Sequence, residues 1–358
     1  ARFKRLVYDD KCHNAADVRT DFPVKILGID TSCDDTSVAV VEDGKHILSN
    51  VISSQFDLHE KYGGIVPELA SRKHIESINY IIDQALAESE VSFQDLTVIA
   101  VTNRPGLIGA LLIGLSAAKA LAFCHNLPLI GINHIEGHVY ANFMQHDELT
   151  FPHICLTVSG GHTLLLKVNR GWTYQILGST IDDAAGEAYD KVAQYLGLGF
   201  PGGRIIDDMA SKGNDKAIDF PRPLIDRDDY NFSFSGLKTS VRYFVEKARK
   251  TGNLPPLEDI AASFQVAVVD VLVKKTIQAA QEYQVKSINL TGGVAANSRL
   301  RCDLRKAADK NDMHVFYPPI KLCTDNAAMV AGVAYQKYQQ GQRDGLELNA
   351  SANSDLGQ

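Results

Sequence analysis

An order of predicted elements that occurs twice along the chain constrains the fold more than any other feature. An apolar strand over 24–29 runs into a polar turn, and two further strands follow over 38–42 and 46–53. The same order returns with strands over 153–158, 164–168 and 172–178. Short apolar runs bounded by turn residues are typical of buried strands. We therefore predict a duplicated βββαβα unit, in which two similar α/β lobes face each other across a cleft.

The first turn of each unit is a candidate phosphate site. Ser159, Gly160 and Gly161 form the second turn, and adjacent glycines let backbone N–H groups approach an anion. Hairpin turns use the same residues where φ is positive, which is the alternative interpretation. Asp34 and Asp35 in the first turn are candidates for a general base, and turn formation is their alternative role.

Two histidines stand four residues apart directly after an apolar run over 127–132. If Asn133 caps a helix, His134 and His138 lie one turn apart on one face and can share a metal ion. Glu136 stands two residues after the first histidine, whereas the zinc-protease motif places its glutamate immediately after it. The pattern predicts a metal site without a proteolytic base, and a histidine pair without a metal is the alternative.

Further segments suggest nucleotide and RNA contacts. A strand over 285–289 precedes Gly292, Gly293 and Asn297, an arrangement suited to close approach of a nucleotide. The stretch 182–191 is predicted to be a helix with an acidic start. Basic residues gather over 238–250 and 299–306; each run is either a solvated helix face or a contact surface for a phosphate backbone.

Composition narrows the class of protein. The chain has 358 residues with 45% hydrophobic and 22% charged residues, and its net charge of -7 argues against a broadly basic nucleic-acid binder. Its six cysteines form no C-x-x-C pair, which favours reduced thiols. The apolar run over 107–123 contains glycines and a lysine and is predicted to be a buried helix, not a membrane span. Residues after 341 are predicted to be a frayed tail.

Eight motifs in chain order resemble the universal tRNA threonylcarbamoyltransferase (TsaD-like) family. The resemblance extends over about residues 25 to 340. The motifs are 28–36 (GIDTSCDDT), 63–72 (GGIVPELASR), 134–138 (HIEGH), 158–163 (VSGGHT), 182–188 (DDAAGEA), 232–239 (FSFSGLKT), 292–297 (GGVAAN) and 324–326 (TDN).

The resemblance implies an actin/Hsp70/sugar-kinase-like two-lobe fold. We expect one lobe over 24–142 plus 325–345, with a closing C-terminal helix, and the other over 143–324. Residues 1–23 would be an N-terminal extension, either the remainder of an organellar presequence or an artificial start. The implied reaction moves the threonylcarbamoyl group from threonylcarbamoyl-AMP to the exocyclic amine of the adenosine beside the anticodon, in tRNAs that read ANN codons, and releases AMP.

Site residues carried over from the family motifs fall into three groups. His134, His138 and Asp325 would bind one divalent metal ion, iron or zinc. Contacts to the acyl-phosphate region would come from 157–161, with Ser159 and Gly160 stabilising charge on the leaving phosphate. The residues of that stretch are Thr157, Val158, Ser159, Gly160 and Gly161. Ribose and adenine would be held by Asp190, Gly203, Asp207 and Asn297.

Thr157 stands where archaeal and eukaryotic cytosolic relatives carry a tyrosine ligand, which favours the bacterial or organellar branch. We expect the mitochondrial member, in the matrix, with a bacterial-type cytoplasmic protein as the alternative. The expected partners are tRNA, an L-threonylcarbamoyladenylate synthase and a second copy of the chain, with no membrane. Two other functions stay open: an ATP-dependent binding scaffold of the Hsp70 or actin type, and a metalloprotease.

Overall fold

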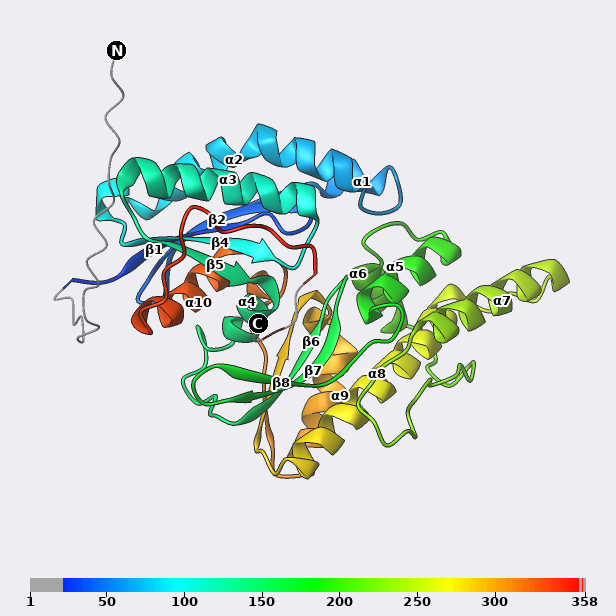
Figure 1. Ribbon diagram of the computed structural model, residues 1–358. Helices are drawn as coiled ribbons and strands as arrows, with labels where there is room; N and C mark the ends of the chain where they lie inside the picture. The colour runs from blue at the N-terminus through cyan, green and yellow to red at the C-terminus, as the bar shows by residue number, and fades with distance from the viewer. Residues whose placement is uncertain (1–21, 354–355, 357–358) are drawn as a thin grey trace, which may run out of the picture.

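The duplication is visible in a computed structural model, which describes residues 22–353 and 356 (Figure 1). The strand order of the first sheet is β3-β2-β1-β4-β5, and that of the second is β8-β7-β6-β9-β10 when written from the matching edge. In each sheet the first three strands are antiparallel and the next two run parallel to the first. The predicted two-lobe α/β architecture is confirmed at the level of the fold.

The strands of the first sheet come from residues 25–133 and those of the second from 153–316. In the first sheet they are β1 (Lys25–Asp30), β2 (Asp35–Glu42), β3 (His46–Ser54), β4 (Val98–Arg104) and β5 (Leu129–Asn133). In the second they are β6 (His153–Val158), β7 (Thr163–Asn169), β8 (Thr173–Ser179), β9 (Ser287–Thr291) and β10 (His314–Phe316). The central strands β1, β4, β6 and β9 are buried almost throughout, as strands covered by helices on both faces must be.

Helices cover both faces of the first sheet. On one face lie α2 (Pro67–Ser89) and α3 (Ile108–His125), and on the other lies α10 (Ala327–Gln339) (Figure 1). Gly28 of β1 allows the close approach of α10, because a Cβ there would lie 2.5 Å from the carbonyl oxygen of Ala327. Among the described residues, α3 is the one helix long and apolar enough to cross a membrane by length and composition. In the structure it packs against α2 and β4.

The second sheet carries the larger helical layer. Its members are α5 (Ala185–Leu196), α6 (Gly202–Ala210), α7 (Ser235–Thr251), α8 (Leu257–Glu282) and α9 (Ser298–Asp309). The largest hydrophobic cluster lies between these helices and the sheet. α7 extends away from the body (Figure 1). The predicted helix over 182–191 begins later than expected, at Ala185, because Asp182 instead binds the start of α7.

Short elements complete the chain. α1 (Phe56–Glu60) precedes α2, and three 3-10 turns lie at Phe93–Asp95, Gly293–Ala296 and Ile320–Leu322. α4 (His134–Ala141) follows β5 directly and contacts elements of both halves, among them β5, α10, β6 and β9. The last strand of the first sheet therefore leads straight into a helix placed between the two sheets. The predicted lobe boundaries at 142–143 and 324–325 stay a prediction.

The prediction of a frayed C-terminal tail is wrong for the residues that the structure describes. The backbone N–H of Asp344 donates to Leu129 O at 2.8 Å, and that of Ser351 donates to Asn103 O at 2.9 Å. Leu348 packs against the hydrophobic cluster beneath α3. The tail therefore runs along the β4–β5 side of the first sheet, a pairing that side-chain periodicity cannot reveal because it is made by backbone groups.

Candidate metal and nucleotide site

The three predicted metal ligands meet where α4 and the start of α10 converge. The side chain of Asn133 caps α4 by accepting a hydrogen bond from Ile135 N at 2.8 Å, as predicted. Nε2 of His134 and Nε2 of His138 lie 3.3 Å and 3.1 Å from Oδ1 of Asp325. One ligand atom from each of the three residues lies within 4.8 Å of the others. The fold thus brings together residues that lie almost 200 positions apart in the sequence.

A second carboxylate orients the first imidazole. Nδ1 of His134 lies 3.3 Å from Oδ2 of Asp30 and 3.1 Å from Oγ of Ser32, and both residues are buried. Histidines that bind metals usually have such a carboxylate or hydroxyl partner on their other nitrogen. Sequence reasoning did not assign Asp30 or Ser32 a role, although polar residues directly after a buried strand were a usable signal.

The charged and titratable groups of the cluster shift one another's pKa values. Burial lowers the pKa of His134, but the carboxylates of Asp325 and Asp30 outweigh it and raise that pKa well above its ordinary value. Burial would also raise the pKa of Asp325, yet the two histidines hold it well below its ordinary value. Two imidazole nitrogens and one carboxylate oxygen suit zinc or iron, so the residues present fit the implied metal.

Glu136 is held away from the histidine pair. Its Oε2 forms an ion pair with Nζ of Lys337 on α10 at 2.7 Å, and both side chains are largely buried. A carboxylate engaged in this way is not free to activate water. The structure therefore agrees with the prediction that the histidine pair does not belong to a protease motif.

The turn after β6 has room for a ligand at its two glycines. Neither Gly160 nor Gly161 has a positive φ, and a Cβ added at either would meet nothing within 4 Å. Hairpin geometry therefore does not require these glycines, which removes the alternative interpretation for this turn. Ser159 closes the turn, because its backbone N–H donates to His162 O at 2.8 Å and its Oγ accepts from His162 N at 3.1 Å.

His162, which sequence reasoning passed over, links the turn to the histidine pair. Burial, followed by the charges of His134 and His138, lowers its pKa to about 4. Its place directly after the two glycines was the available signal. The imidazole of His162 therefore lies within electrostatic range of His134 and His138.

Thr157 and Val158 lie at the buried end of β6 beside the glycine turn that follows β9. Both side chains are fully buried. A Cβ at Gly292, where φ is +90°, would lie 2.4 Å from Val158 O, so only glycine permits this approach. Contacts from Thr157 and Val158 to a ligand would have to come from the backbone, and such contacts stay a prediction.

Asp190 binds the start of α6. Its Oδ1 accepts a hydrogen bond from Gly202 N at 2.7 Å. Burial raises its pKa to about 6, and the N–H groups of Gly202 and Gly203 act in the opposite direction. A Cβ at Gly203 would meet nothing within 4 Å, so open space lies beside this carboxylate.

Asp207 and Asn297 both cap α9 in this structure. Asp207 accepts hydrogen bonds from Ser298 N at 2.9 Å and from Ser298 Oγ at 2.8 Å. Asn297 accepts from Leu300 N at 2.9 Å and donates to Gln265 Oε1 at 2.8 Å. Their predicted contacts to ribose and adenine stay a prediction, and their helix-capping role was not foreseen.

The first turn carries carboxylates with raised pKa values. Burial, followed by the charge of Asp34, raises the pKa of Asp35 to about 7. Burial and then the charge of Asp325 raise the pKa of Asp34. A carboxylate that titrates near neutral pH suits general base chemistry. The charge of Asp34 also contributes, as the smallest of the named causes, to the raised pKa of Asp190.

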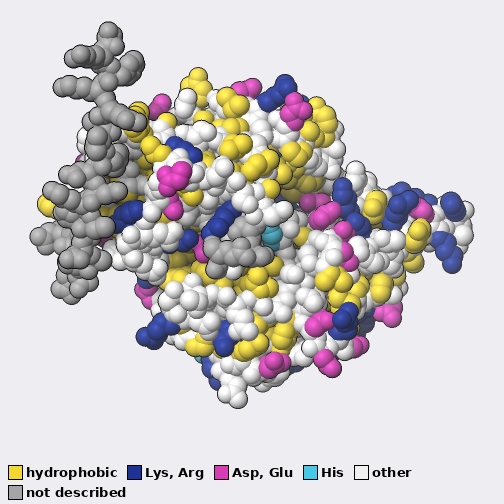
Figure 2. All heavy atoms as spheres, in the orientation of Figure 1, with side chains coloured by type: hydrophobic (Ala, Val, Ile, Leu, Met, Phe, Trp, Pro, Cys, Tyr) yellow, Lys and Arg dark blue, Asp and Glu magenta, His cyan; other side chains and the backbone are white. Residues whose placement is uncertain are grey.

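The two basic runs differ in how many of their side chains already bind other groups of the protein. On α9, Arg299 pairs with Asp215 and Asp303, and Arg301 donates to Pro318 O and Ala295 O. On α7, Lys238 pairs with Asp183, whereas Lys247 and Lys250 near the far end are exposed. Lys and Arg side chains gather along this protruding helix (Figure 2). α7 therefore offers the more accessible cationic surface.

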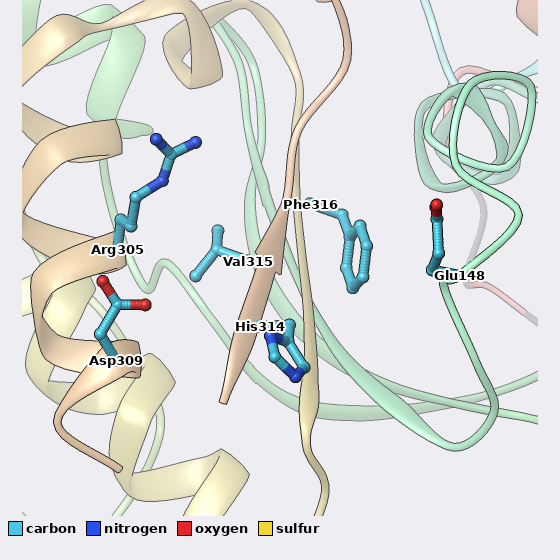
Figure 3. Close-up of a pocket in the computed structure, with 6 residues that line it drawn as sticks. All are labelled: Glu148, Arg305, Asp309, His314, Val315 and Phe316. Carbon is cyan, nitrogen blue, oxygen red and sulfur yellow. The ribbon is translucent and has the colours of Figure 1, made fainter. Parts of the chain in front are cut away.

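A separate groove of about 460 Å³ contains none of these residues. It lies between α9 and β10, where Val315 points toward Arg305 and Asp309, and Phe316 points toward Glu148 (Figure 3). It is open and lined by side chains of mixed charge. We therefore place the functional site at the His–His–Asp cluster and not at this groove.

Solved structures with the same fold differ widely in sequence. Component A of the Acidaminococcus fermentans (R)-2-hydroxyglutaryl-CoA dehydratase is 17% identical with a TM-score of 0.53, covering 88% of this chain and 98% of that one. HypF of T. kodakarensis is 15% identical with a TM-score of 0.59, covering 90% of this chain and 50% of that one. These similarities establish the fold.

Curated relatives are much closer in sequence. The protein named tRNA N6-adenosine threonylcarbamoyltransferase in Syntrophomonas wolfei is 51% identical over 91% of this chain and 96% of its own length. Proteins of the same name in Clostridioides difficile and Thermotoga neapolitana are 49% and 50% identical, over 93% and 92% of this chain and 98% and 99% of their own. The TsaD model matches residues 46–332. The chain therefore belongs to the TsaD family of tRNA N6-adenosine threonylcarbamoyltransferases.

Proposed function

We propose that this protein transfers the threonylcarbamoyl group from threonylcarbamoyl-AMP to the exocyclic N6 amine of the adenosine beside the anticodon in tRNAs that read ANN codons. The amine nitrogen forms a bond to the carbamoyl carbon, and the bond from that carbon to the phosphate oxygen breaks. AMP leaves with the electron pair of that bond, and the amine loses one proton. Family membership supports the reaction class.

One observation supports the proposal most directly: His134, His138 and Asp325 form a cluster that could hold a metal ion. The Gly160–Gly161 turn is open, and the charges of His134 and His138 act on His162 directly after it. An acyl-phosphate ligand needs such a pairing of a cationic centre with backbone donors. The N–H groups of Gly160 and Gly161 donate to no other residue in the described part of the chain, so they are available to the phosphate.

His134, His138 and Asp325 would hold a divalent ion, zinc or iron, which supplies Lewis acidity toward the phosphate or carbonyl oxygens. Asp190 would accept a hydrogen bond from a ribose hydroxyl across the open space at Gly203. Asp35, with its pKa raised to about 7, is our candidate for the group that accepts the proton of the amine, with Asp34 as its neighbour. Ser159 and Gly160 would stabilise the leaving phosphate.

The tRNA is proposed to lie along α7. Its exposed lysines and arginines form a local cationic surface on a chain whose net charge is -7. Phosphate contacts supply most of the sequence-independent affinity for nucleic acids. The engaged arginines of α9 are the weaker candidate, since they already bind acidic side chains and carbonyls.

The test uses purified protein, threonylcarbamoyl-AMP and unmodified tRNA. We expect threonylcarbamoyladenosine and AMP in equal amounts, detected by mass spectrometry of digested tRNA, and no product with Asp325→Asn. Failure to form product with metal-loaded protein, even when an L-threonylcarbamoyladenylate synthase supplies the donor, would refute the proposed activity. Metal analysis of the same preparation identifies the ion.

We also propose a homodimer. Large apolar side chains are exposed on α2 and α3, among them Ile75 at 63%, Tyr80 at 76% and Phe123 at 73%. Light scattering should give twice the chain mass, and Tyr80→Glu should shift it toward the monomer. For location we propose the mitochondrial matrix, with bacterial-type cytoplasm as the alternative; fractionation of the source cells distinguishes the two.

A further inference from the structure

The helix that carries both histidines is bound from two different sheets. At its start, His134 contacts Asp30, the last residue of β1 in the first sheet, and Ser32, which follows this strand. At its other end, the carbonyl oxygen of His138 accepts a hydrogen bond from Oγ1 of Thr291 at 2.6 Å. Thr291 is the last residue of β9 in the second sheet. The two histidine residues are thus held by different halves of the molecule, His134 through its imidazole and His138 through its backbone carbonyl.

α4 needs these contacts because it is short. The last carbonyl groups of a helix have no partner within the helix, and in a helix of eight residues they make up half of the total. His138 O is satisfied by Thr291, and Val139 O accepts from Asn289 Nδ2 at 2.9 Å. Asn142 returns the contact by donating to Leu290 O at 3.1 Å. Side chains of a distant strand therefore cap the helix.

This seam is dry. Thr291, Asn289, Asn142 and His138 all have 0% exposure. A buried carbonyl that loses its only side-chain donor cannot turn to water, so the loss of the Thr291 hydroxyl would be felt by the helix itself. His138 would have to shift to recover a partner, and its Nε2 would then move relative to Asp325.

Thr291 also borders the predicted ligand stretch. It is the register partner of Thr157 on β6, and Gly292 directly after it lies against Val158 O. One side chain therefore joins the backbone beside Thr157 and Val158 to the carbonyl of a metal ligand.

We propose that Thr291 is a positioning residue for the metal site, which holds His138 against Asp325 through the carbonyl of His138. Asn289 makes a parallel contact to the next carbonyl of α4, that of Val139. This role rests on the proposed metal site and goes beyond it, because it assigns to β9 the placement of one of the ligands.

The experiment compares Thr291→Val, which keeps the shape and removes the hydroxyl, with Thr291→Ser, which restores it. The matched control is Thr276→Val: Thr276 is equally buried on α8, and its hydroxyl donates to Leu272 O at 2.7 Å. Zn²⁺ affinity of chelator-treated protein is measured by competition with a chromophoric chelator. We expect the Kd to rise by about tenfold or more in Thr291→Val and to stay within about twofold in the other two.

A second readout does not depend on metal. Amide hydrogen exchange of 138–143 in the apoprotein should accelerate in Thr291→Val and not in Thr276→Val. Faster exchange together with a wild-type protein that binds no Zn²⁺ would refute the proposed metal site while supporting the contact to α4. Unchanged exchange and unchanged Zn²⁺ affinity in Thr291→Val would overturn the proposal. If this variant does not fold, Thr291→Cys, with its weaker donor, replaces it.

Discussion

The Oδ2 atom of Asp30 lies 3.3 Å from Nδ1 of His134, so the last residue of β1 orients an imidazole of the candidate metal site. Asp30 is 1% exposed, and its other oxygen accepts a hydrogen bond from Ser32 N at 3.0 Å. A carboxylate fixed in this manner sets both the tautomer and the direction of the ring. The first sheet therefore contributes to the metal site without contributing a ligand.

Asp30→Asn is expected to weaken metal binding by about 10- to 100-fold. The neutral amide lacks the negative charge with which the carboxylate orients the His134 imidazole and raises its basicity as a ligand. The measurement is Zn²⁺ affinity of the apoprotein, with Asp83→Asn on the exposed face of α2 as the control. Equal affinities of the variant and the wild type would show that Asp30 has no part in orienting His134.

Gly160→Ala is expected to leave stability within about 0.5 kcal/mol of wild type, since the added Cβ meets nothing within 4 Å. The KM for threonylcarbamoyl-AMP should rise by about tenfold or more if the turn holds the phosphate. Gly186→Ala is the contrasting variant: its Cβ would lie 2.5 Å from Ser159 O, and we expect a loss of about 1–3 kcal/mol in urea unfolding. A wild-type KM for Gly160→Ala would remove the turn from the site.

Replacing Lys247 and Lys250 together by glutamate should weaken tRNA binding by about tenfold and reduce the steepness of its salt dependence, because two phosphate contacts are lost. The kcat at saturating tRNA should be unchanged, since both lysines lie far along α7. The check is a filter-binding titration at several salt concentrations. The control is Lys310→Glu, an exposed lysine just beyond α9; equal effects of the two changes would point to general electrostatics and not to α7.

His153 should make the protein less stable in mild acid. Burial lowers its pKa to about 4 from an ordinary 6.5, so the unfolded chain binds a proton between these values and the folded chain does not. The stabilisation is complete above pH 6.5 and is lost as pH falls toward 4, which amounts to about 2 kcal/mol between pH 7.5 and pH 5.0. Urea unfolding at both pH values should show this difference shrinking in His153→Phe. The same replacement at exposed His46 should leave it unchanged.

The sequence predicts the duplicated sheet order well because its information is local: each strand is a short apolar run that ends in a polar or glycine turn. It also predicts the His134–His138 pair, whose spacing of one helical turn is fixed once Asn133 caps the helix. Asp325 could be assigned only through the resemblance to the family motifs. Nothing in the local sequence links it to the histidines, because the fold alone brings these distant residues together.

Contacts made by backbone groups or by single side chains of distant strands could not be predicted. The Thr291 hydroxyl shows no pattern in the sequence, and its partner is a carbonyl that every residue carries. Asn297 and Asp207 were singled out as nucleotide contacts, yet in the structure they cap α9, because amide and carboxylate groups suit both roles equally.

The tail that follows α10 covers an exposed edge of the first sheet. β5 is an edge strand, and Asp344 occupies its open side by pairing with Leu129. An uncovered edge is a template for association with other chains. Proteins cut before Asp344 are expected to aggregate more readily, so the segment 344–351 shields an edge that would otherwise be open to other chains.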